Sequence, residues 1–247
     1  MTDVVKLHVS ASAALCAKAK KQIKKKYSYK QPPESIQALF DPPKEDNFFL
    51  ERSLQQQGYS VVVGLDEVGR GPLAGPVVAA AVILPENCQH SLFIDSKKLT
   101  AKKRETLFEY LHEIPAQIGI GIVSHKIIDK INILQASLLA MKRGVSELKK
   151  QSIECDFLLV DGKFPVPIKK TQQPLIKGET RSASIAAASI IAKVTRDRIM
   201  AKLHKTYPLY NFIKNQGYPT KEHREAISVH GITPHHRITF RGVKEFV

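Results

Sequence analysis

Residues 61–84, VVVGLDEVGRGPLAGPVVAAAVIL, form an apolar run that is interrupted by two adjacent acids and an arginine. The charged residues are Asp66, Glu67 and Arg70. Because unpaired charge is costly to bury, a strand that served the core alone would not carry all three of them. The segment therefore predicts a core strand that ends in a functional site.

Two buried strands, residues 60–68 and 76–84, are predicted from the valine-rich halves of this segment. The link between them is short and rich in glycine and proline, so it cannot cross over between parallel strands. We therefore expect the two strands to pair antiparallel. The link also permits a sharp bend, which would let the neighbouring side chains of Asp66 and Glu67 reach one site.

Apolar patterns along the rest of the chain predict further strands and helices. The strands are expected at residues 114–124, 156–161 and 174–177. The helices are expected at residues 47–57, 100–111, 127–150, 182–203 and, in the tail, 221–228. This order predicts an α/β fold, with a mixed sheet of about five strands flanked by helices.

The charge balance of the chain is strongly basic. Its 38 lysines and arginines outnumber its 23 aspartates and glutamates, which gives a net charge of +15. Such an excess suggests a polyanion as partner, usually nucleic acid and less often an anionic membrane surface. Lysine and proline are concentrated in residues 1–45, so we expect a basic, Pro-rich N-terminal extension before a catalytic domain of residues 46–247.

Other features of the composition indicate a cytoplasmic protein. The cysteines are scattered, odd in number and without metal-ligand spacing, as is typical of reduced thiols. No apolar run reaches the roughly 18 residues of a membrane span. The N-terminus resembles a signal peptide only faintly, because polar residues interrupt its apolar stretch and Asp3 stands where positive charge belongs. We expect a monomer without a membrane partner.

Acids fall at the ends of two predicted strands. Asp66 and Glu67 end the first, and Asp161 ends residues 156–161. Side chains from different strands converge at such ends in open α/β sheets. Carboxylates gathered there would repel one another unless a cation neutralised them, and oxygen ligands favour Mg²⁺ or Mn²⁺ over zinc. Since paired divalent ions commonly serve phosphodiester hydrolysis, the pattern indicates a two-metal nuclease.

Two other interpretations use the same residues. The acids can be strand-end residues bridged to arginines, with Asp161 only preceding a turn. The glycines of residues 69–74 also match the spacing of a dinucleotide-binding turn. That turn must open a helix, whereas residues 76–84 are predicted to be a strand, and acids would repel a pyrophosphate.

Five segments resemble the ribonuclease HII family, in that family's order and spacing. They are GLDEVGRGPLAGPVVAAAVIL at 64–84, DSKKLT at 95–100, LLVDG at 158–162, SIAAASIIAKVTRDR at 184–198 and NQGYPTKEH at 215–223. The resemblance covers residues 46–247, and its first and helical segments are highly specific. The DEVGRG form argues against the sister ribonuclease HIII family, despite the long N-terminal extension.

The resemblance implies a ribonuclease H-like fold and endonucleolytic cleavage of RNA in RNA–DNA hybrids. It also implies incision at single ribonucleotides in duplex DNA, leaving 5′-phosphate and 3′-hydroxyl ends. The family's catalytic, metal-binding acids correspond to Asp66, Glu67, Asp161 and Glu179, with Mg²⁺ or Mn²⁺ as cofactor. The family's fourth acid is usually the Asp of a Lys-Gly-Asp stretch, whereas this chain has Glu179, whose side chain is one methylene longer. Alternatively, Glu179 can be an acid that is favourable near a helix N-terminus.

The resemblance further implies contacts to substrate. The backbone of Gly69, Arg70 and Gly71 approaches the ribose 2′-hydroxyl, the group that separates RNA from DNA. Tyr218 is similar to a tyrosine that packs against the deoxyribose at the RNA–DNA junction.

Several residues near these motifs have simpler expected roles. Ser96 and Lys97 fit the positioning of phosphate, whereas Lys98 fits a solvated loop. Asp197, inside the long helix, fits an ion pair, and the small residues of AAAS at 186–189 would let that helix lie close to the sheet. Adjacent histidines at 235–236 are more typical of a tail than of a metal site.

Three alternatives stay open. Residues 37–40, QALF, loosely resemble a peptide that binds a sliding clamp. Another two-metal nuclease on the same sheet would use the same acids. A nucleic-acid-binding module that has lost catalysis through its altered fourth acid would share the motifs and the charge.

Overall fold

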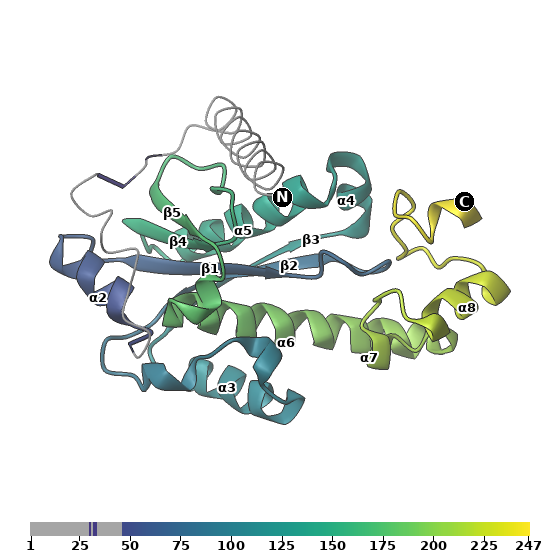
Figure 1. Cartoon of the computed structure of the whole chain (residues 1–247), viewed down its shortest axis with the longest axis horizontal. Coiled ribbons are helices and arrows are strands. Elements are labelled where there is room, and N and C mark those ends of the chain that lie inside the picture. Colours follow the sequence, from purple (N-terminus) through teal and green to yellow (C-terminus); the bar gives the residue numbers. More distant parts are fainter. Residues whose placement is uncertain (1–29, 31, 34–45) are drawn as a thin grey trace, which may run out of the picture.

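The computed structural model describes residues 30, 32–33 and 46–247 (Figure 1). The predicted extension of residues 1–45 lies almost entirely outside them, and so does the clamp-like segment 37–40. Both therefore stay predictions. Lys30 forms an isolated parallel bridge with Thr171 at one edge of the sheet.

A mixed five-stranded sheet forms the centre of the fold, in the order β3-β2-β1-β4-β5. The strands are β1 (Val62–Val68), β2 (Val77–Ile83), β3 (Gln117–Val123), β4 (Phe157–Asp161) and β5 (Thr171–Leu175). β2 pairs antiparallel with both β1 and β3, whereas β4 pairs parallel with both β1 and β5. The predicted α/β class, the mixed sheet and the antiparallel first pair are confirmed.

The predicted fifth strand is present, but it spans residues 171–175 and not the predicted 174–177, so the predicted bounds are wrong. Its sequence, TQQPL, is polar, so it lacks an apolar signal. Gln172 is nevertheless fully buried, because its side-chain amide bonds to the backbone N–H and carbonyl of Val166 at 2.8 and 3.0 Å. Lys177 has a φ of 56° and turns the chain out of the strand.

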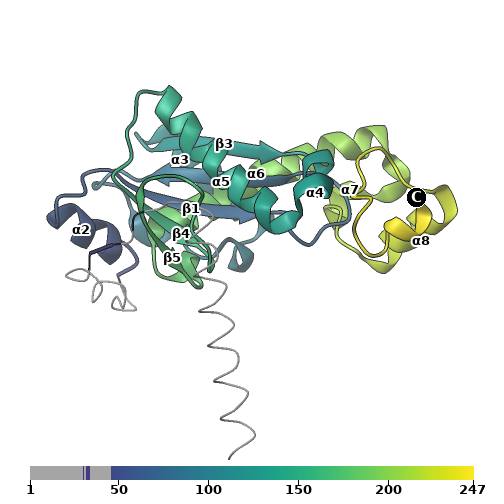
Figure 2. The ribbon, with the colours of Figure 1, turned by 90° about the horizontal axis from the view of Figure 1, so that it is seen from above.

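Helices cover both faces of the sheet (Figures 1 and 2). α6 (Ala183–Thr206) and α3 (Ala101–Glu113) lie on one face, and α5 (Ile133–Lys150) lies on the other. Because successive residues of a strand face opposite sides, alternate residues of β2 enter the two apolar cores. α2 (Phe49–Gln56) packs near the sheet edge that β4 and β5 form.

The predicted helix of residues 127–150 is two helices. α4 (His125–Ile131) and α5 are separated by Asn132, which has a φ of 66°. The Asn132 side chain accepts a hydrogen bond from the Gln135 N–H at 3.1 Å and so caps α5. An asparagine tolerates positive φ and caps helices well, which is why a continuous apolar pattern conceals a break.

Helix α6 lies directly on the backbone of β1 at Gly64. A Cβ atom on Gly64 would be 2.2 Å from the carbonyl carbon of Ser184. The expected role of the small residues near the start of α6 is confirmed, since Ala186, Ala187 and Ala188 are all fully buried. This contact brings the N-terminus of α6 beside the end of β1.

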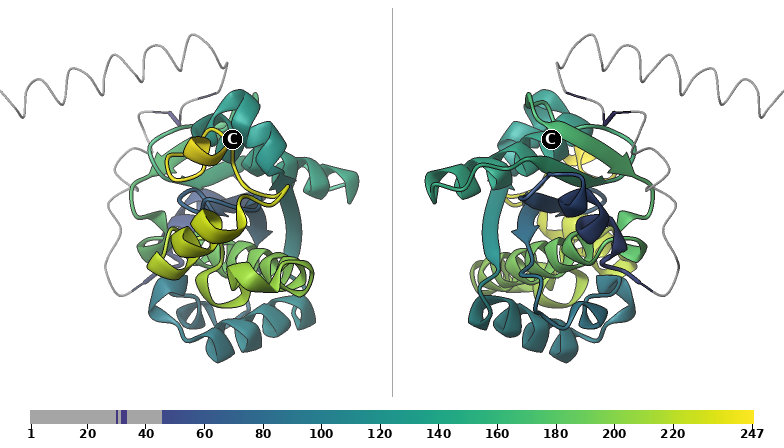
Figure 3. Two further views of the ribbon diagram at one scale, coloured as in Figure 1. Left: turned by 90° about the vertical axis from the view of Figure 1, so that its right-hand side faces the viewer. Right: turned by 90° about the vertical axis from the view of Figure 1, so that its left-hand side faces the viewer.

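The C-terminal helices α7 (Phe212–Asn215) and α8 (Lys221–His230) pack at the far end of α6 (Figure 3). Their apolar residues enclose Leu73, which belongs to the link between β1 and β2. The tail therefore supports that link. No helix in the described part of the chain is long and apolar enough to span a membrane.

Replacing Gly64 with alanine tests the contact between α6 and β1. The added methyl group has no space, so either the helix or the strand must shift. We expect Gly64→Ala to lower the free energy of unfolding by about 3 kcal/mol, measured by urea denaturation. Lys142→Ala, on the exposed side of α5, is the control and should change it by less than about 0.5 kcal/mol. Equal stability of the two variants would contradict this packing.

Candidate active site

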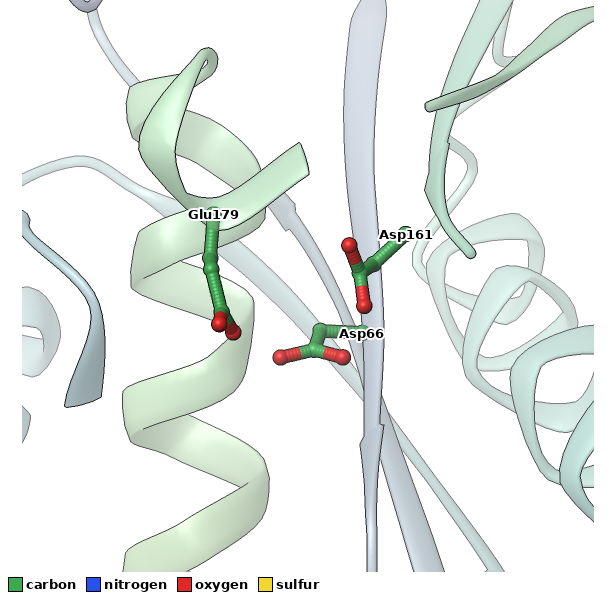
Figure 4. A group of neighbouring side chains, drawn as sticks. All are labelled: Asp66, Asp161 and Glu179. Atoms are coloured by element: carbon green, nitrogen blue, oxygen red, sulfur yellow. The ribbon is translucent and has the colours of Figure 1, made fainter. Parts of the chain in front are cut away.

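Three carboxylates meet where β1 and β4 end beside the start of α6 (Figure 4). Asp66 comes from β1, Asp161 from the last position of β4, and Glu179 from the short 3₁₀ turn that precedes α6. One oxygen from each carboxylate lies within 4.8 Å of the others. The side chain of Glu179 points toward the two aspartates. The structure thus brings together three of the four acids predicted as metal ligands.

Asp161 fixes the turn that carries Glu179. Its Oδ1 accepts a hydrogen bond from the Gly178 N–H at 2.7 Å. A side chain at Gly178 would meet Ile185 at 2.6 Å and this same carboxylate at 3.2 Å. The glycine of the Lys-Gly-Glu sequence therefore leaves room for both of these side chains.

Glu67, the fourth predicted ligand, lies beside this cluster. It forms an ion pair with Arg70, with 3.2 Å between the Arg70 Nη1 and the Glu67 Oε1. Burial raises the pKa of Glu67 to about 7, although the Arg70 guanidinium opposes the shift. One alternative interpretation was that the strand-end acids are bridged to arginines. Among the clustered acids and Glu67, the described residues show such a bridge at Glu67.

Asp66 is the most deeply buried of the clustered acids, with 5% of its surface exposed. Burial, followed by the charges of Glu67, Asp161 and Glu179, raises its pKa well above the ordinary value. Burial also raises the pKa of Asp161, against the effect of the Gly178 N–H. These carboxylates repel one another, so the site favours any cation that they can share.

Lys97 reaches this cluster from the opposite side. Its Nζ lies 2.9 Å from Glu179 Oε1, while its side chain is 78% exposed. Burial alone would lower the pKa of Lys97, but the ion pair with Glu179 outweighs it and the net shift is upward. Of its predicted companions, Ser96 is buried and Lys98 is exposed. Lys97 thus contacts the acids while most of its side chain stays accessible to solvent.

The donor set of the cluster suits a hard divalent cation. Asp66, Asp161 and Glu179 offer carboxylate oxygens only, and Mg²⁺ and Mn²⁺ prefer such ligands. The described residues contribute one ammonium group, Lys97, to balance these charges by direct contact. The residues therefore fit a metal site.

The link between β1 and β2 lies next in the chain after the acids. Gly69, with a φ of 99°, begins it, and Arg70 and Gly71 are exposed. A Cβ on Gly71 would be 3.3 Å from the Tyr218 ring, which is itself 40% exposed. Of the predicted sugar-contacting residues, Arg70, Gly71 and Tyr218 are therefore exposed, whereas Gly69 is buried.

Two buried arginines, Arg196 and Arg237, hold the link from beneath, and sequence reasoning missed both. Arg196 donates to the carbonyls of Ala74 and Pro76. Arg196 lies on the same buried side of α6 as Ala192 and Met200, which are four residues before and after it. This helical spacing was a signal in the sequence that Arg196 is buried. Arg237 stands in the irregular tail, where no periodicity marks it.

A histidine pair stabilises the turn that carries Tyr218. The Nε2 atoms of His223 and His236 share a hydrogen bond of 3.0 Å. The other ring nitrogen of His223, Nδ1, lies 2.9 Å from the Tyr218 carbonyl oxygen. His236 is therefore a packing residue of the tail. Asp197, as expected, forms an ion pair with Lys193 at 2.7 Å.

Removing one charge from the cluster should stabilise the metal-free protein. We expect Asp66→Asn to raise the melting temperature in EDTA at pH 8 by about 2–4 °C, corresponding to about 1 kcal/mol of relieved repulsion. Differential scanning calorimetry measures it. Because the pKa values of these acids are higher in the folded state than in the unfolded state, the wild type gains stability as they take up protons. This gain begins as the pH falls through about 7, the pKa of Glu67, and is complete near the ordinary carboxyl pKa. The effect of the substitution should therefore shrink at pH 5, and a lower melting temperature for Asp66→Asn at pH 8 would contradict this electrostatic description.

Comparison with known proteins shows the family to which this chain belongs. The family model described as Ribonuclease HII matches residues 63–243. The ribonuclease HII of Desulfotalea psychrophila is 66% identical over 203 residues, which are 82% of this chain and 90% of that protein. The ribonuclease HII of Syntrophus aciditrophicus is 53% identical over 192 residues, 78% of this chain and 89% of that protein.

Solved structures show the same architecture. The ribonuclease H2 of Pyrococcus horikoshii matches with a TM-score of 0.59 and 28% identity, covering 75% of this chain and 96% of that one. The Bst ribonuclease HIII, crystallised with Mn²⁺, has the same fold, with a TM-score of 0.63, 18% identity, and coverage of 75% and 68%. The ribonuclease H-like fold is thus confirmed. Family model and relatives together show that this chain belongs to the ribonuclease HII family, whose members are endoribonucleases.

Proposed function

We propose that this ribonuclease H, besides acting on RNA–DNA hybrids, cuts duplex DNA at single embedded ribonucleotides. It would leave 5′-phosphate and 3′-hydroxyl ends. The observation that carries the proposal is the approach of Asp66, Asp161 and Glu179 within 4.8 Å, with the exposed Arg70 and Gly71 only four and five residues after Asp66 in the chain. The acids that would bind metal and the exposed backbone that would contact a sugar are therefore neighbours in the chain.

We assign the metal-binding role to Asp66, Asp161 and Glu179, with Glu67 at the margin. Mg²⁺ or Mn²⁺ ions bound as a pair would neutralise the cluster and supply Lewis-acid chemistry at the scissile phosphate. Asp161 holds Glu179 in place through the Gly178 N–H. Lys97 would leave Glu179 when a phosphate arrives and bind that phosphate, which positions the strand without reading its sequence.

Recognition of the ribonucleotide is assigned to Gly69, Arg70, Gly71 and Tyr218. Glycine leaves the backbone open to a sugar, and the 2′-hydroxyl is the group that a reader of RNA must contact. The Tyr218 ring beside Gly71 would pack against the neighbouring deoxyribose. The net charge of +15 supports binding of a duplex polyanion. The free thiols Cys88 and Cys155 support action in the cytoplasm.

One assay separates this function from its alternatives. Three duplexes of one sequence are compared: all DNA, a single ribonucleotide in DNA, and an RNA–DNA hybrid, each with and without Mn²⁺. We expect metal-dependent cuts in the second and third only, mapped on a sequencing gel. Cutting of all-DNA duplex would indicate another two-metal nuclease. Binding without any cutting would indicate a module that has lost catalysis.

Asp161→Asn should abolish cleavage while leaving binding of the ribonucleotide duplex largely intact. The substitution removes a charge that metal needs, but the asparagine Oδ1 can still accept the Gly178 N–H. Cleavage and fluorescence anisotropy in EDTA measure the two properties. Loss of binding together with cleavage would show that Asp161 acts structurally rather than through metal.

Glu179→Asp tests whether this chain has adapted to the longer acid. The shorter side chain withdraws its oxygens from Asp66, and such a displacement can lower turnover by as much as about 100-fold. The control is Asp197→Asn, which removes an acid of α6 that is paired with Lys193 and lies outside the cluster. We expect that control to keep near wild-type turnover. Full activity of Glu179→Asp would mean that this corner tolerates either acid.

A further inference from the structure

Two guanidinium groups are buried without carboxylate partners beneath the link between β1 and β2. Arg196 and Arg237 are fully buried, and neither forms an ion pair within the described part of the chain. Burial lowers the pKa of Arg196 to about 10 and that of Arg237 to about 9. Keeping two such charges out of water is costly, so the contacts that they make must be specific.

Arg237 bonds to the carbonyls at both ends of the link. Its Nη2 donates to the Gly69 oxygen at 2.6 Å and its Nη1 to the Arg70 oxygen at 3.0 Å. Its Nε donates to the Gly75 oxygen at 3.1 Å. One planar group thus closes the link into a loop of fixed shape.

Arg196 ties the same loop to the turn that carries Tyr218. It donates to the Ala74 oxygen at 3.2 Å and, through Nη1, to the Gln216 oxygen at 2.9 Å. The Leu73 N–H completes the connection by donating to the Gly217 oxygen at 2.7 Å. The loop and the turn are therefore held as one unit.

The inward carbonyls determine where the N–H groups of the loop point. All described peptide bonds are trans, and a trans peptide directs its carbonyl and its N–H in opposite directions. The carbonyls of Gly69 and Arg70 face Arg237, so the N–H groups of Arg70 and Gly71 face away from it. Neither N–H has an acceptor among the described residues, and both residues are exposed.

We propose that Arg237, assisted by Arg196, is a positioning residue for substrate discrimination. It turns the Arg70 and Gly71 N–H groups toward the sugar, so that a 2′-hydroxyl oxygen can accept from them. A deoxyribose in the same place would leave these donors without a partner, and an unmade hydrogen bond at a closed contact is penalised. This inference rests on the proposed cleavage at ribonucleotides and adds which residues set the preference.

Arginine is suited to this role in a way that lysine is not. A guanidinium carries five donors in one plane and can bond to several carbonyls at once, whereas an ammonium is a compact charge with no such fixed fork. Arg237→Lys therefore keeps the charge and loses the geometry. That substitution separates the two contributions.

The test measures a ratio of dissociation constants by fluorescence anisotropy in EDTA, which prevents cleavage. The probes are a duplex with one ribonucleotide and an all-DNA duplex of identical sequence. We expect wild type to bind the ribonucleotide duplex more tightly. Arg237→Lys should reduce the ratio by roughly threefold to tenfold, the equivalent of about one hydrogen bond. Arg196→Lys should reduce it less, because Arg196 packs against Gly69 but does not hydrogen-bond to the carbonyls of Gly69 or Arg70.

Leu148→Ala is the control for loss of stability. Leu148 is fully buried between α5 and the sheet, in the core on the opposite side from α6. Its truncation should lower the melting temperature at least as much as Arg237→Lys. Because the ratio does not depend on the fraction of folded protein, we expect Leu148→Ala to keep the wild-type ratio.

The outcomes are distinct. A reduced ratio in Arg237→Lys with an unchanged ratio in Leu148→Ala supports the proposal. An unchanged ratio in Arg237→Lys, or an equal fall in Leu148→Ala, overturns it. If Arg237→Lys does not fold, an unchanged ratio in Arg196→Lys overturns it instead. Equal binding of both duplexes by wild type, without cleavage at the ribonucleotide, rejects the proposed function itself and this inference with it.

Discussion

The contact between helix α6 and the backbone of β1 determines the geometry of the site. At Gly64 the helix lies so near the strand that no side chain fits between them. The strand continues from there to Asp66, and the turn at the start of the helix carries Glu179. A larger separation would part the two acids, because Asp66 lies two residues beyond Gly64 and Glu179 lies in the turn that precedes α6. The alanines of α6 and the glycine of β1 thus set the distance across which a cation must act.

Much of this arrangement could be predicted from the sequence. Strong apolar runs identified β1, β2 and β4, and acids at the strand ends indicated where Asp66 and Asp161 would converge. The resemblance to ribonuclease HII placed Glu179 at the same site, which spacing alone did not require. The bounds of β5 were predicted wrongly because its polar residue Gln172 is buried through hydrogen bonds. The division of α4 from α5 was missed because one asparagine supplies both the turn and the cap.

The buried arginines show a further limit of sequence reasoning. Arg237 lies more than 160 residues from the carbonyls of Gly69 and Gly75 that it contacts, so no local pattern connects them. Its position depends on the tail packing around Leu73. The site therefore has two charged parts on neighbouring segments: acids that could hold a metal ion, and guanidiniums that bond to the carbonyls of a loop. Hydrolysis would depend on the first part and the choice of sugar on the second.

In the proposed function, the clustered carboxylates hold divalent ions at the scissile bond of a ribonucleotide. The most direct measurement is the amount of Mn²⁺ that the full chain binds in complex with a duplex that carries a non-hydrolysable ribonucleotide linkage. Electron paramagnetic resonance of free Mn²⁺ reports it. We expect saturation at about two ions per chain in the wild type and clear loss of bound Mn²⁺ in Asp66→Asn. Equal Mn²⁺ binding by the two proteins would contradict it.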